Sequence, residues 1–516
     1  MSAEQLLSKF DYDKFLWKPS NDEPSLFQRP LAGVELVQDL WNRFEKGGQT
    51  LFVALNLVLV TPTSEALLRE AARRAWIALR HQIPIVATSI DIDENENPIL
   101  KYRVPNTHQV DEWAARTLVV HTQTAVDLYQ VHAELGDQKI PSADGDQTWM
   151  HLILPSSPAE IDQIGFIFHT HHSITDGHGS QILVNAYLTE FGQQLGNTGA
   201  EVQFRWGEEV DRLPPDCFTI LNPAEPLLIK PDSTEEPSFG DPVYGTLGAE
   251  MQRIGDSMQN VYGFKPRDGD KSAWPAYRHI DLEFSEDESK HLLAYMKEQP
   301  HTLTVLAHAA LAMVVMSNNP PSSEFGQYKL NNFTLLDVRH RLREPFSSRH
   351  GFAGYALSTP IFQVPVSLFL GSDGMALPLD RATLLKVMED VGPRYKAQRD
   401  MPPGYLALAA EVFCQGLKQG YAANLVPPAQ CYTFSSDGRG ENKLDSMFHD
   451  KQGRPMFKLA RFFTSISRIH PAPFFRLSSW QGVIDLGSDY NENLISREEV
   501  EAYLAKWKEF MGLVIQ

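Results

Sequence analysis

The chain has 516 residues, 42% of them hydrophobic and 22% charged, and its 46 basic and 65 acidic residues give a formal net charge of −19. This hydrophobic share excludes a disordered chain, and the length predicts two domains rather than one core. The acidic balance argues against nucleic acid and anionic membrane surfaces as partners, because both carry phosphate charges.

Cysteine usage and the N-terminus indicate a cytoplasmic protein. The three cysteines, Cys217, Cys414 and Cys431, are too widely spaced for a disulfide framework or a zinc motif, as expected in a reducing compartment. Residues 1–5 lack the basic and apolar regions of a signal peptide. The longest apolar run, residues 51–60, is too short to span a bilayer.

Strands and helices alternate in the first half of the chain. Residues up to about 48 are polar and rich in Pro, Asp and Trp, which predicts an irregular segment with one short helix. Residues 51–60 are apolar on both faces and predict a central strand, after which Pro62 opens a helix. Further strands are predicted at residues 99–104 and 149–154. This rhythm indicates an α/β layer with mixed connections.

A long linker is predicted at residues 213–275. Nine prolines fall there, against 34 in the whole chain, and the periodicity of the flanking segments is lost. The linker divides the chain into an N-terminal lobe, residues 1–212, and a C-terminal lobe, residues 276–516. The second lobe repeats the strand–helix rhythm, which indicates two related lobes.

The second half begins with a predicted strand at residues 279–284, and the capping box Ser285-x-x-Glu288 then starts a helix. Residues 304–316 are apolar and rich in alanine, which predicts a buried helix. The remaining predicted elements are strands at 332–338, 354–357 and 361–366, a helix at 382–395, and a last helix that opens with Ser496-x-x-Glu499.

The most informative stretch is residues 168–179, which reads His-His-x-x-x-Asp-Gly from His171 to Gly177. The apolar residues 164–168 predict a buried strand before it, and apolar residues recur at helical spacing after it. The histidines therefore lie where a strand leaves the core and a helix begins. At such a place a polar side chain can be held rigidly and still face a cleft.

A histidine in this position can act as a general base, because its unperturbed pKa lies near neutrality. Asp176 could orient the ring of His172 directly, or it could fix the loop through an arginine elsewhere. Gly177 allows another backbone to approach closely. The alternative is a His-rich turn with a core histidine and no catalytic role.

The motif from His171 to Gly177 resembles the HHxxxDG signature of a large acyltransferase superfamily. This superfamily includes plant BAHD acyltransferases, the condensation domains of nonribosomal peptide synthetases, and chloramphenicol acetyltransferase. Residues 337–341, Asp-Val-Arg-His-Arg, are similar to the Asp-Gly-Arg-Ser-Arg segment of BAHD enzymes. Residues 434–440, however, lack the aromatic residues of the BAHD Asp-Phe-Gly-Trp-Gly segment. The length and these variants resemble fungal acetyltransferases of secondary metabolism, such as the trichothecene 15-O-acetyltransferases.

The resemblance implies an α/β fold of two chloramphenicol-acetyltransferase-like lobes, each a mixed sheet with helices, and an active-site channel between them. It implies that His172 is the catalytic base, midway along that channel. Asp176 would be structural and paired with Arg339, and His171 and Gly177 would support the same loop.

The resemblance also implies an acyl-CoA:alcohol O-acetyltransferase. Acetyl-CoA would be the co-substrate and a hydroxylated small molecule the acceptor, with no bound cofactor, no metal and no obligatory protein partner. His172 would take the proton of the acceptor hydroxyl. The acceptor oxygen would then attack the thioester directly, without a covalent acyl-enzyme.

Candidate groups for the oxyanion and for CoA lie near the end of the chain. The hydroxyl groups of Ser435 and Ser436, and backbone N–H groups near Gly177, are candidate oxyanion donors. Residues 437–476 carry eight Lys or Arg against four Asp or Glu, and within them Arg439 and Lys443 are candidates for the CoA phosphates. The alternatives are ordinary turn serines and a solvated charged loop.

Three rival interpretations stay open. A condensation domain would use the same histidine on carrier-bound acyl groups, although the chain contains no Gly-Gly-x-Ser carrier segment. A zinc hydrolase is suggested by His169, His171 and His178, but Asp176 lies too far along the chain for the His-x-His-x-Asp-His spacing. The third interpretation is a binding module with an inactive site.

Overall fold

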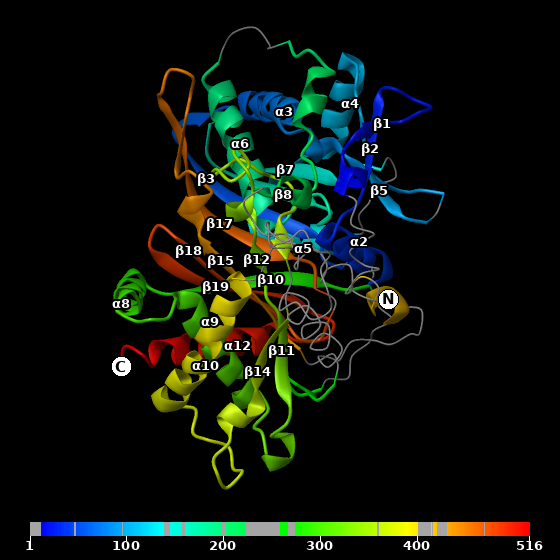
Figure 1. Ribbon diagram of the computed structural model, residues 1–516. Helices are drawn as coiled ribbons and strands as arrows, with labels where there is room; N and C mark the ends of the chain where they lie inside the picture. The colour runs from blue at the N-terminus through cyan, green and yellow to red at the C-terminus, as the bar shows by residue number, and fades with distance from the viewer. Residues whose placement is uncertain are drawn as a thin grey trace.

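The structure, a computed structural model, has two lobes that lie one above the other in Figure 1. It describes residues 12–45, 48–94, 96–138, 145–156, 160–197, 203–222, 259–266, 274–358, 361–400, 414, 416–420, 431–468 and 470–516. Most of the predicted linker, residues 213–275, lies outside these ranges. Among the helices that are described, none combines the length and the apolar character needed to cross a bilayer.

A six-stranded sheet with the order β16-β17-β3-β8-β7-β6 forms the centre of the first lobe. Its strands and covering helices are β3 (Leu51–Thr63), β6 (Leu118–Gln123), β7 (Thr148–Pro155), β8 (Ile161–Thr170), β16 (Met447–His449), β17 (Pro455–Ile466), α3 (Glu65–Gln82), α5 (Leu128–Gly136) and α6 (Gly177–Leu195). Helices α3 and α6 pack on the face that carries Phe166, and α5 packs on the face that carries Ile167. Successive residues of a strand point to opposite faces, so the sheet is covered on both sides.

The N-terminal segment is more regular than its composition predicted. It contributes strands to a second sheet of the first lobe, with the order β1-β2-β5-β4. The further elements of this lobe are β1 (Lys18–Pro19), β2 (Leu26–Pro30), β4 (Ser89–Ile92), β5 (Pro98–Arg103), α2 (Val34–Phe44), α4 (Thr107–Thr117) and 3-10 helices at Tyr12–Phe15, Pro84–Ala87, Glu208–Arg212 and Cys217–Ile220. A buried ion pair between Arg29 and Glu35, at 2.7 Å, ties α2 to β2. The prediction of an irregular segment is therefore wrong for residues 12–45, although the predicted helix is present as α2.

The first long helix does not begin at Pro62, as the sequence had predicted. Strand β3 continues to Thr63, and α3 begins after the N-cap Ser64, whose side chain accepts a hydrogen bond from Leu67 N. The ladder between β3 and β8 is irregular from Val58 to Thr63. Pro62 is exposed in that irregular part, where its missing N–H leaves no regular ladder position unfilled. Serine is the better N-cap because its side-chain oxygen accepts a bond from a free helix N–H.

The second lobe is built on a four-stranded sheet with the order β10-β19-β18-β15, beside two smaller sheets, β14-β11-β9 and β12-β13. The strands are β9 (Val261–Tyr262), β10 (Tyr277–Glu283), β11 (Lys329–Phe333), β12 (Leu336–Asp337), β13 (Leu357–Ser358), β14 (Ile361–Pro365), β15 (Thr433–Arg439), β18 (Phe474–Trp480) and β19 (Val483–Asn491). The helices are α8 (Glu286–Lys297), α9 (Leu303–Asn318), α10 (Arg381–Arg399), α12 (Arg497–Gly512) and 3-10 helices at Ser323–Phe325, Arg339–Arg341, Val366–Phe369 and Gly440–Asn442. With both lobes in place, the predicted two-lobed α/β class is confirmed.

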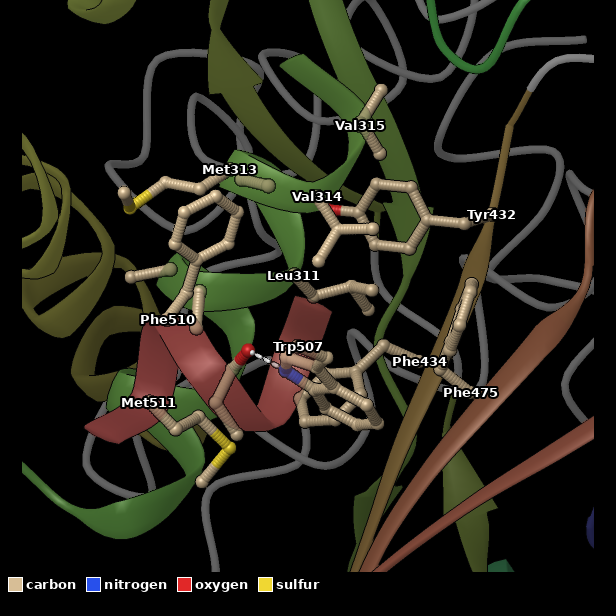
Figure 2. Packing of buried hydrophobic residues seen from close by; sticks show 14 of the residues in the cluster. Leu311, Met313, Val314, Val315, Tyr432, Phe434, Phe475, Trp507, Phe510 and Met511 are labelled. Carbon is tan, nitrogen blue, oxygen red and sulfur yellow. Dashed lines mark hydrogen bonds between the residues drawn. The ribbon is translucent and has the colours of Figure 1, made fainter. Parts of the chain in front are cut away.

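The core of the second lobe is arranged around Trp507. Helix α9 is buried on all sides, as its apolar composition predicted, and α12 packs along it. Figure 2 shows the indole of Trp507 between α9 and the sheet residues Phe434 and Phe475, with its N–H directed at a backbone carbonyl. Trp507 Nε1 donates to Ala307 O at 2.7 Å, so the one polar group of this side chain is satisfied inside an apolar core.

The strand predicted at residues 332–338 is broken into two. Strand β11 ends at Phe333, β12 covers only Leu336–Asp337, and a 3-10 turn begins at Arg339. The Asp337 side chain accepts a hydrogen bond from Arg339 N at 3.0 Å, a local bond that competes with continuation of the strand. This turn directs the side chain of Arg339 toward the first lobe.

The two halves of the chain are not separated cleanly in space. Strands β16 and β17 come from the C-terminal half but belong to the sheet of the first lobe, where β17 pairs with β3 from Leu51 to Leu59. In Figure 1, β17 lies alongside the strands of the N-terminal half. The lobes 1–212 and 276–516 stay a prediction, and residues 447–466 cross the boundary between them.

Replacing Trp507 by Phe should destabilise the protein by about 2–4 kcal/mol, because the change leaves a cavity and removes the hydrogen bond to Ala307 O. Urea unfolding followed by circular dichroism measures this loss. Trp480→Phe is the matched control, since Trp480 Nε1 has no hydrogen-bond partner and its ring is only partly buried. Equal losses in the two variants would show that the hydrogen bond at Trp507 contributes nothing.

Candidate active site

The HHxxxDG motif forms a tight turn between β8 and α6. Strand β8 ends at Thr170, and the helix begins at Gly177 with Asp176 as its N-cap. The turn is fixed at both ends, because His171 N donates to Gln147 O at 2.9 Å and Ile174 N donates to His171 O at 3.0 Å. Ile174 lies in the core of the first lobe and anchors the middle of the turn.

The ring of His172 is held in one tautomer. Its Nδ1 lies 2.9 Å from Thr175 O, and because a carbonyl oxygen only accepts, Nδ1 carries the proton. In the neutral ring the lone pair is therefore on Nε2. Among the described residues Nε2 has no hydrogen-bond partner, and it is not one of the fully enclosed polar atoms, so it faces open space. Burial lowers the pKa of His172 below its usual value, which favours this neutral form.

His171 has the opposite tautomer. Its Nδ1 accepts a hydrogen bond from Ser173 N at 3.2 Å, so in the neutral ring the proton is on Nε2. Burial, with the neighbouring His172 as a second cause, lowers the pKa of His171 to about 3. His171 is therefore a neutral side chain that fixes the loop. Of the two histidines, only His172 has a ring nitrogen left free to accept a proton.

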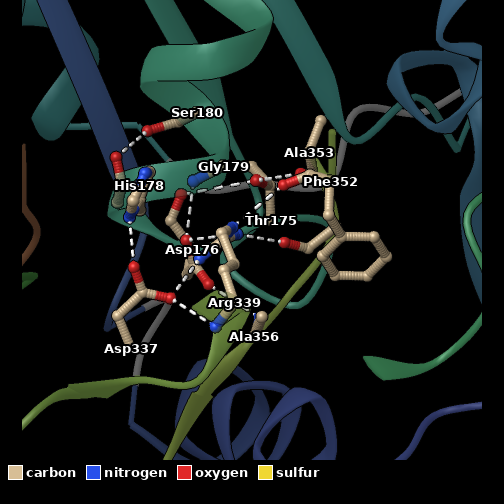
Figure 3. Close-up of polar contacts among 12 residues, drawn as sticks. Thr175, Asp176, His178, Gly179, Ser180, Asp337, Arg339, Phe352, Ala353 and Ala356 are labelled. Carbon is tan, nitrogen blue, oxygen red and sulfur yellow. Dashed lines mark hydrogen bonds and ion pairs between the residues drawn. The ribbon is translucent and has the colours of Figure 1, made fainter. Parts of the chain in front are cut away.

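Asp176 connects the motif to the second lobe and does not contact His172. Figure 3 shows its fully buried carboxylate between Gly179, Arg339 and Ala356. Oδ1 accepts from Gly179 N at 2.7 Å and from Arg339 Nη2 at 3.0 Å, and Oδ2 accepts from Ala356 N at 2.7 Å. Of the two roles left open by the sequence, the carboxylate therefore has the one that acts through an arginine.

Arg339 distributes its donors over two segments of the second lobe. Besides Asp176 it binds Phe352 O at 2.9 Å, Gly354 O at 2.6 Å and Asp337 Oδ1 at 3.2 Å. The guanidinium is 4% exposed, so these partners replace the water that it has lost. Its contacts hold the segment 352–356 against the start of α6.

The close backbone approach expected at Gly177 occurs two residues later. A Cβ on Gly177 would meet only Thr464 Cγ2, at 4.0 Å. A Cβ on Gly179 would lie 2.5 Å from Ala353 O and would also collide with the side chain of Thr175. Gly179 is therefore a residue that the sequence analysis missed, since nothing local shows that a distant loop passes so close.

The two serines proposed for the oxyanion are engaged elsewhere. Ser435 Oγ donates to Asp437 Oδ1 at 2.6 Å, and Ser436 Oγ lies 2.8 Å from Thr304 Oγ1 of α9. Both hydroxyl groups already have partners in the second lobe. The geometry favours the alternative for these residues, an ordinary structural role in β15.

Most of the basic side chains in residues 437–476 are also engaged. Lys443 is buried and donates from Nζ to Asp437 O at 2.6 Å, and Arg468 donates to two backbone carbonyls. Ion pairs with carboxylates hold Arg454, Arg461 and Arg476. Arg439, Lys451 and Lys458 are exposed and have no carboxylate partner among the described residues, so these three are the most available to a phosphate at the surface.

The three histidines that suggested zinc have separate surroundings. His169 stacks on Phe52 with ring centroids 4.4 Å apart, and His178 Nδ1 lies 2.5 Å from Asp337 Oδ2. Within the ranges that the structure describes, no three His, Cys, Asp or Glu side chains are grouped in a way that could hold a metal ion.

Replacing Arg339 by Gln should destabilise the protein by about 3–5 kcal/mol, because the fully buried carboxylate of Asp176 loses its cation. Urea unfolding measures the loss. The control is Arg69→Gln on α3, whose ion pair with Glu65 is exposed and should be worth at most about 0.5 kcal/mol. A similar, small effect of both changes would mean that the buried pair does not hold the lobes together.

Comparison with known proteins supports the chemistry suggested by this loop. The model of a family described as 15-O-acetyltransferase Tri3 matches residues 9–340. A curated relative, trichothecene O-acetyltransferase TRI3 of Trichoderma arundinaceum, is 20% identical over 535 residues and covers 99% of each protein.

Solved structures share the fold. TRI3 trichothecene 15-O-acetyltransferase from Fusarium sporotrichioides superposes with a TM-score of 0.82 and 18% identity, over 97% of this chain and 98% of that chain. The epimerization domain from the third module of tyrocidine synthetase B has a TM-score of 0.54 and 12% identity, over 95% of this chain and 96% of its own. At these identities the two structures show the fold alone. The family match covers more than half of the chain and includes both the His172 loop and Arg339, and the chain therefore belongs to the Tri3 family of 15-O-acetyltransferases.

Proposed function

We propose that this acetyltransferase moves the acetyl group of acetyl-CoA onto the 15-hydroxyl group of a trichothecene, with His172 as the general base. The observation that carries the proposal is the tautomer of His172. Because Thr175 O holds the proton on Nδ1, the free Nε2 can accept a proton from an acceptor hydroxyl. The family and the relatives in Trichoderma and Fusarium support this choice of acyl donor and acceptor.

The proposed reaction is a direct transfer. Nε2 of His172 takes the hydroxyl proton while the acceptor oxygen bonds to the thioester carbonyl carbon, and the carbonyl electron pair moves onto its oxygen. The tetrahedral intermediate then collapses, the C=O bond re-forms and the C–S bond breaks. The thiolate of CoA leaves with the proton that His172 returns. A positioned base of this kind is worth roughly 10²–10⁴-fold in rate.

A condensation-type reaction with a carrier-bound thioester is the alternative. It stays the alternative because it would use the same histidine. The likeness to the epimerization domain extends to the fold alone. Activity with free acetyl-CoA and no carrier protein would exclude it for this chain.

The purified protein, incubated with acetyl-CoA and a trichothecene that carries a free 15-hydroxyl group, should form the 15-acetyl ester, detected by mass spectrometry. His172→Ala should lower kcat by about 10²–10⁴-fold, because the base is lost. His171→Gln is the matched comparison. It changes the adjacent buried ring but leaves Nε2 of His172 in place, so a smaller loss is expected. Full turnover by a folded His172→Ala protein would contradict the proposed role.

The pH dependence of kcat/KM should show an acid limb below the ordinary histidine pKa of 6.5. Burial lowers the pKa of His172, so the ring stays neutral and active at pH values where an exposed histidine is already protonated. Activity should fall only when the pH drops through this lowered value. An acid limb at or above 6.5 would mean that another group, or a charged His172, controls the reaction.

A further inference from the structure

The proposed reaction creates a negative charge on the thioester oxygen, and the two serines first considered for it are already bonded elsewhere. The sheet of the second lobe offers another group. One face of β18 and β19 carries Phe475, Leu477 and Leu486 and packs on the helices of that lobe. The opposite face carries Arg476, which is 6% exposed and lies between the lobes.

Arg476 is held rigidly by two carboxylates. Its Nε donates to Asp489 Oδ2 at 2.9 Å and its Nη1 donates to Asp437 Oδ2 at 3.3 Å. Asp489 is fixed in turn by His279 Nδ1 at 2.6 Å, and Asp437 accepts from Ser435 Oγ. A guanidinium supported on two sides in this way keeps one orientation and loses little entropy when it binds a further oxygen.

The same carboxylate connects Arg476 to the strands that carry the motif. Asp489 Oδ2 accepts a hydrogen bond from Ile466 N of β17 at 3.1 Å. Ile466 pairs with Leu51 of β3, and Leu51 pairs with Thr170 at the end of β8. Thr170 is two residues before His172. Two residues back along β17, Thr464 lies next to Gly177 and accepts a hydrogen bond from Gln181 of α6.

The guanidinium of Arg476 has N–H groups that its two ion pairs do not use. The two ion pairs use Nε and Nη1, and among the described residues Nη2 has no partner. Nη2 is also not one of the fully enclosed polar atoms, and the other contact of the guanidinium is with the ring of Phe474, whose centroid lies 4.5 Å from Cζ. Two N–H groups of a fixed cation are therefore free to donate to a further oxygen, as Nε2 of His172 is free to accept a proton.

We propose that Arg476 is a catalytic residue whose Nη2 donates hydrogen bonds to the oxyanion of the tetrahedral intermediate. This inference rests on the acyl transfer at His172 proposed above. When the acceptor oxygen bonds to the carbonyl carbon, the electron pair of the C=O bond moves to the oxygen that faces Nη2. The charge is neutralised there until the C=O bond re-forms and the C–S bond breaks. No proton is taken from Arg476.

The charges around His172 agree with this arrangement. His171 and Asp176 are on its own loop, Tyr355 faces the ring with centroids 5.6 Å apart, and the charge of Arg476, on a strand of the second lobe, also acts on the ring. Burial has the largest effect on the pKa of His172 and lowers it, the hydrogen bond to Thr175 O and the charge of Asp176 raise it, and the charge of Arg476 lowers it. Removing the cation of Arg476 should therefore raise the pKa of His172 and shift the acid limb of the pH profile to higher pH.

Arg476→Gln and Arg476→Lys test the proposal in the full-length protein with acetyl-CoA and the 15-hydroxy acceptor. Arg476→Gln should lower kcat by about 10²–10³-fold with little change in the acceptor KM, because one oxyanion donor is lost. Its acid limb should move to higher pH. Arg476→Lys keeps the charge without the planar fork, so the limb should stay in place while kcat falls by a smaller factor.

Arg461→Gln is the matched control, since Arg461 also pairs with carboxylates between the lobes but is not among the groups that act on His172. Arg461→Gln should keep the wild-type kcat and the wild-type acid limb of the pH profile. A wild-type kcat in either folded Arg476 variant, or a loss confined to the acceptor KM, would overturn the proposal. If Arg476→Gln does not fold, the kcat of Arg476→Lys alone tests the proposal. A wild-type protein without acetyl transfer would instead contradict the function on which the inference rests.

Discussion

The ion pair between Asp176 and Arg339 is the interaction on which the site depends. It joins residues 163 positions apart in the chain, and the carboxylate is fully buried. Burying two charges costs several kcal/mol each, so the pair adds little stability beyond what two apolar side chains would give. The pair matters because it fixes the position of the loop relative to the second lobe. Asp176 caps α6, accepts from Ala356 N and binds a guanidinium that also holds two carbonyls, so the loop can lie against the second lobe in one way only.

That fixed loop determines which of the two histidines has a ring nitrogen free to accept a proton. His171 and His172 are neighbours of the same residue type, and burial lowers the pKa of both. They differ in what the backbone offers them, a donor N–H from Ser173 for one and an acceptor carbonyl from Thr175 for the other. The proton therefore lies on opposite nitrogens of the two rings. In the proposed reaction a backbone turn, rather than a carboxylate partner, therefore assigns the role of base.

Local patterns in the sequence predicted much of the fold. The strand before the motif, the buried helix α9 and the capped starts at Ser285 and Ser496 depend on neighbours along the chain, and the structure contains each of them. The start of α3 was misplaced on a local signal, whereas the failures that concern the site are long-range. No local signal shows that β17 crosses to the first lobe, or that residues 332–338 must bend so that Arg339 reaches Asp176.

The site was predictable only in part for the same reason. The resemblance supplied the candidates His172 and Asp176 through a motif of seven residues, and Arg339 through the separate segment 337–341. Ser435 and Ser436 looked suitable by position, yet a hydroxyl group is available only if its neighbours leave it free, and Asp437 and Thr304 do not. The pKa of His172 is lowered mainly by burial and raised by the hydrogen bond to Thr175 O and by the charge of Asp176. In the proposed reaction the ring must first take a proton and then return it, and a base is most effective in both steps when its pKa stays close to the working pH. Burial makes the imidazolium costly, and two groups offset part of that cost: first the hydrogen bond to Thr175 O, then the charge of Asp176, which never touches the ring.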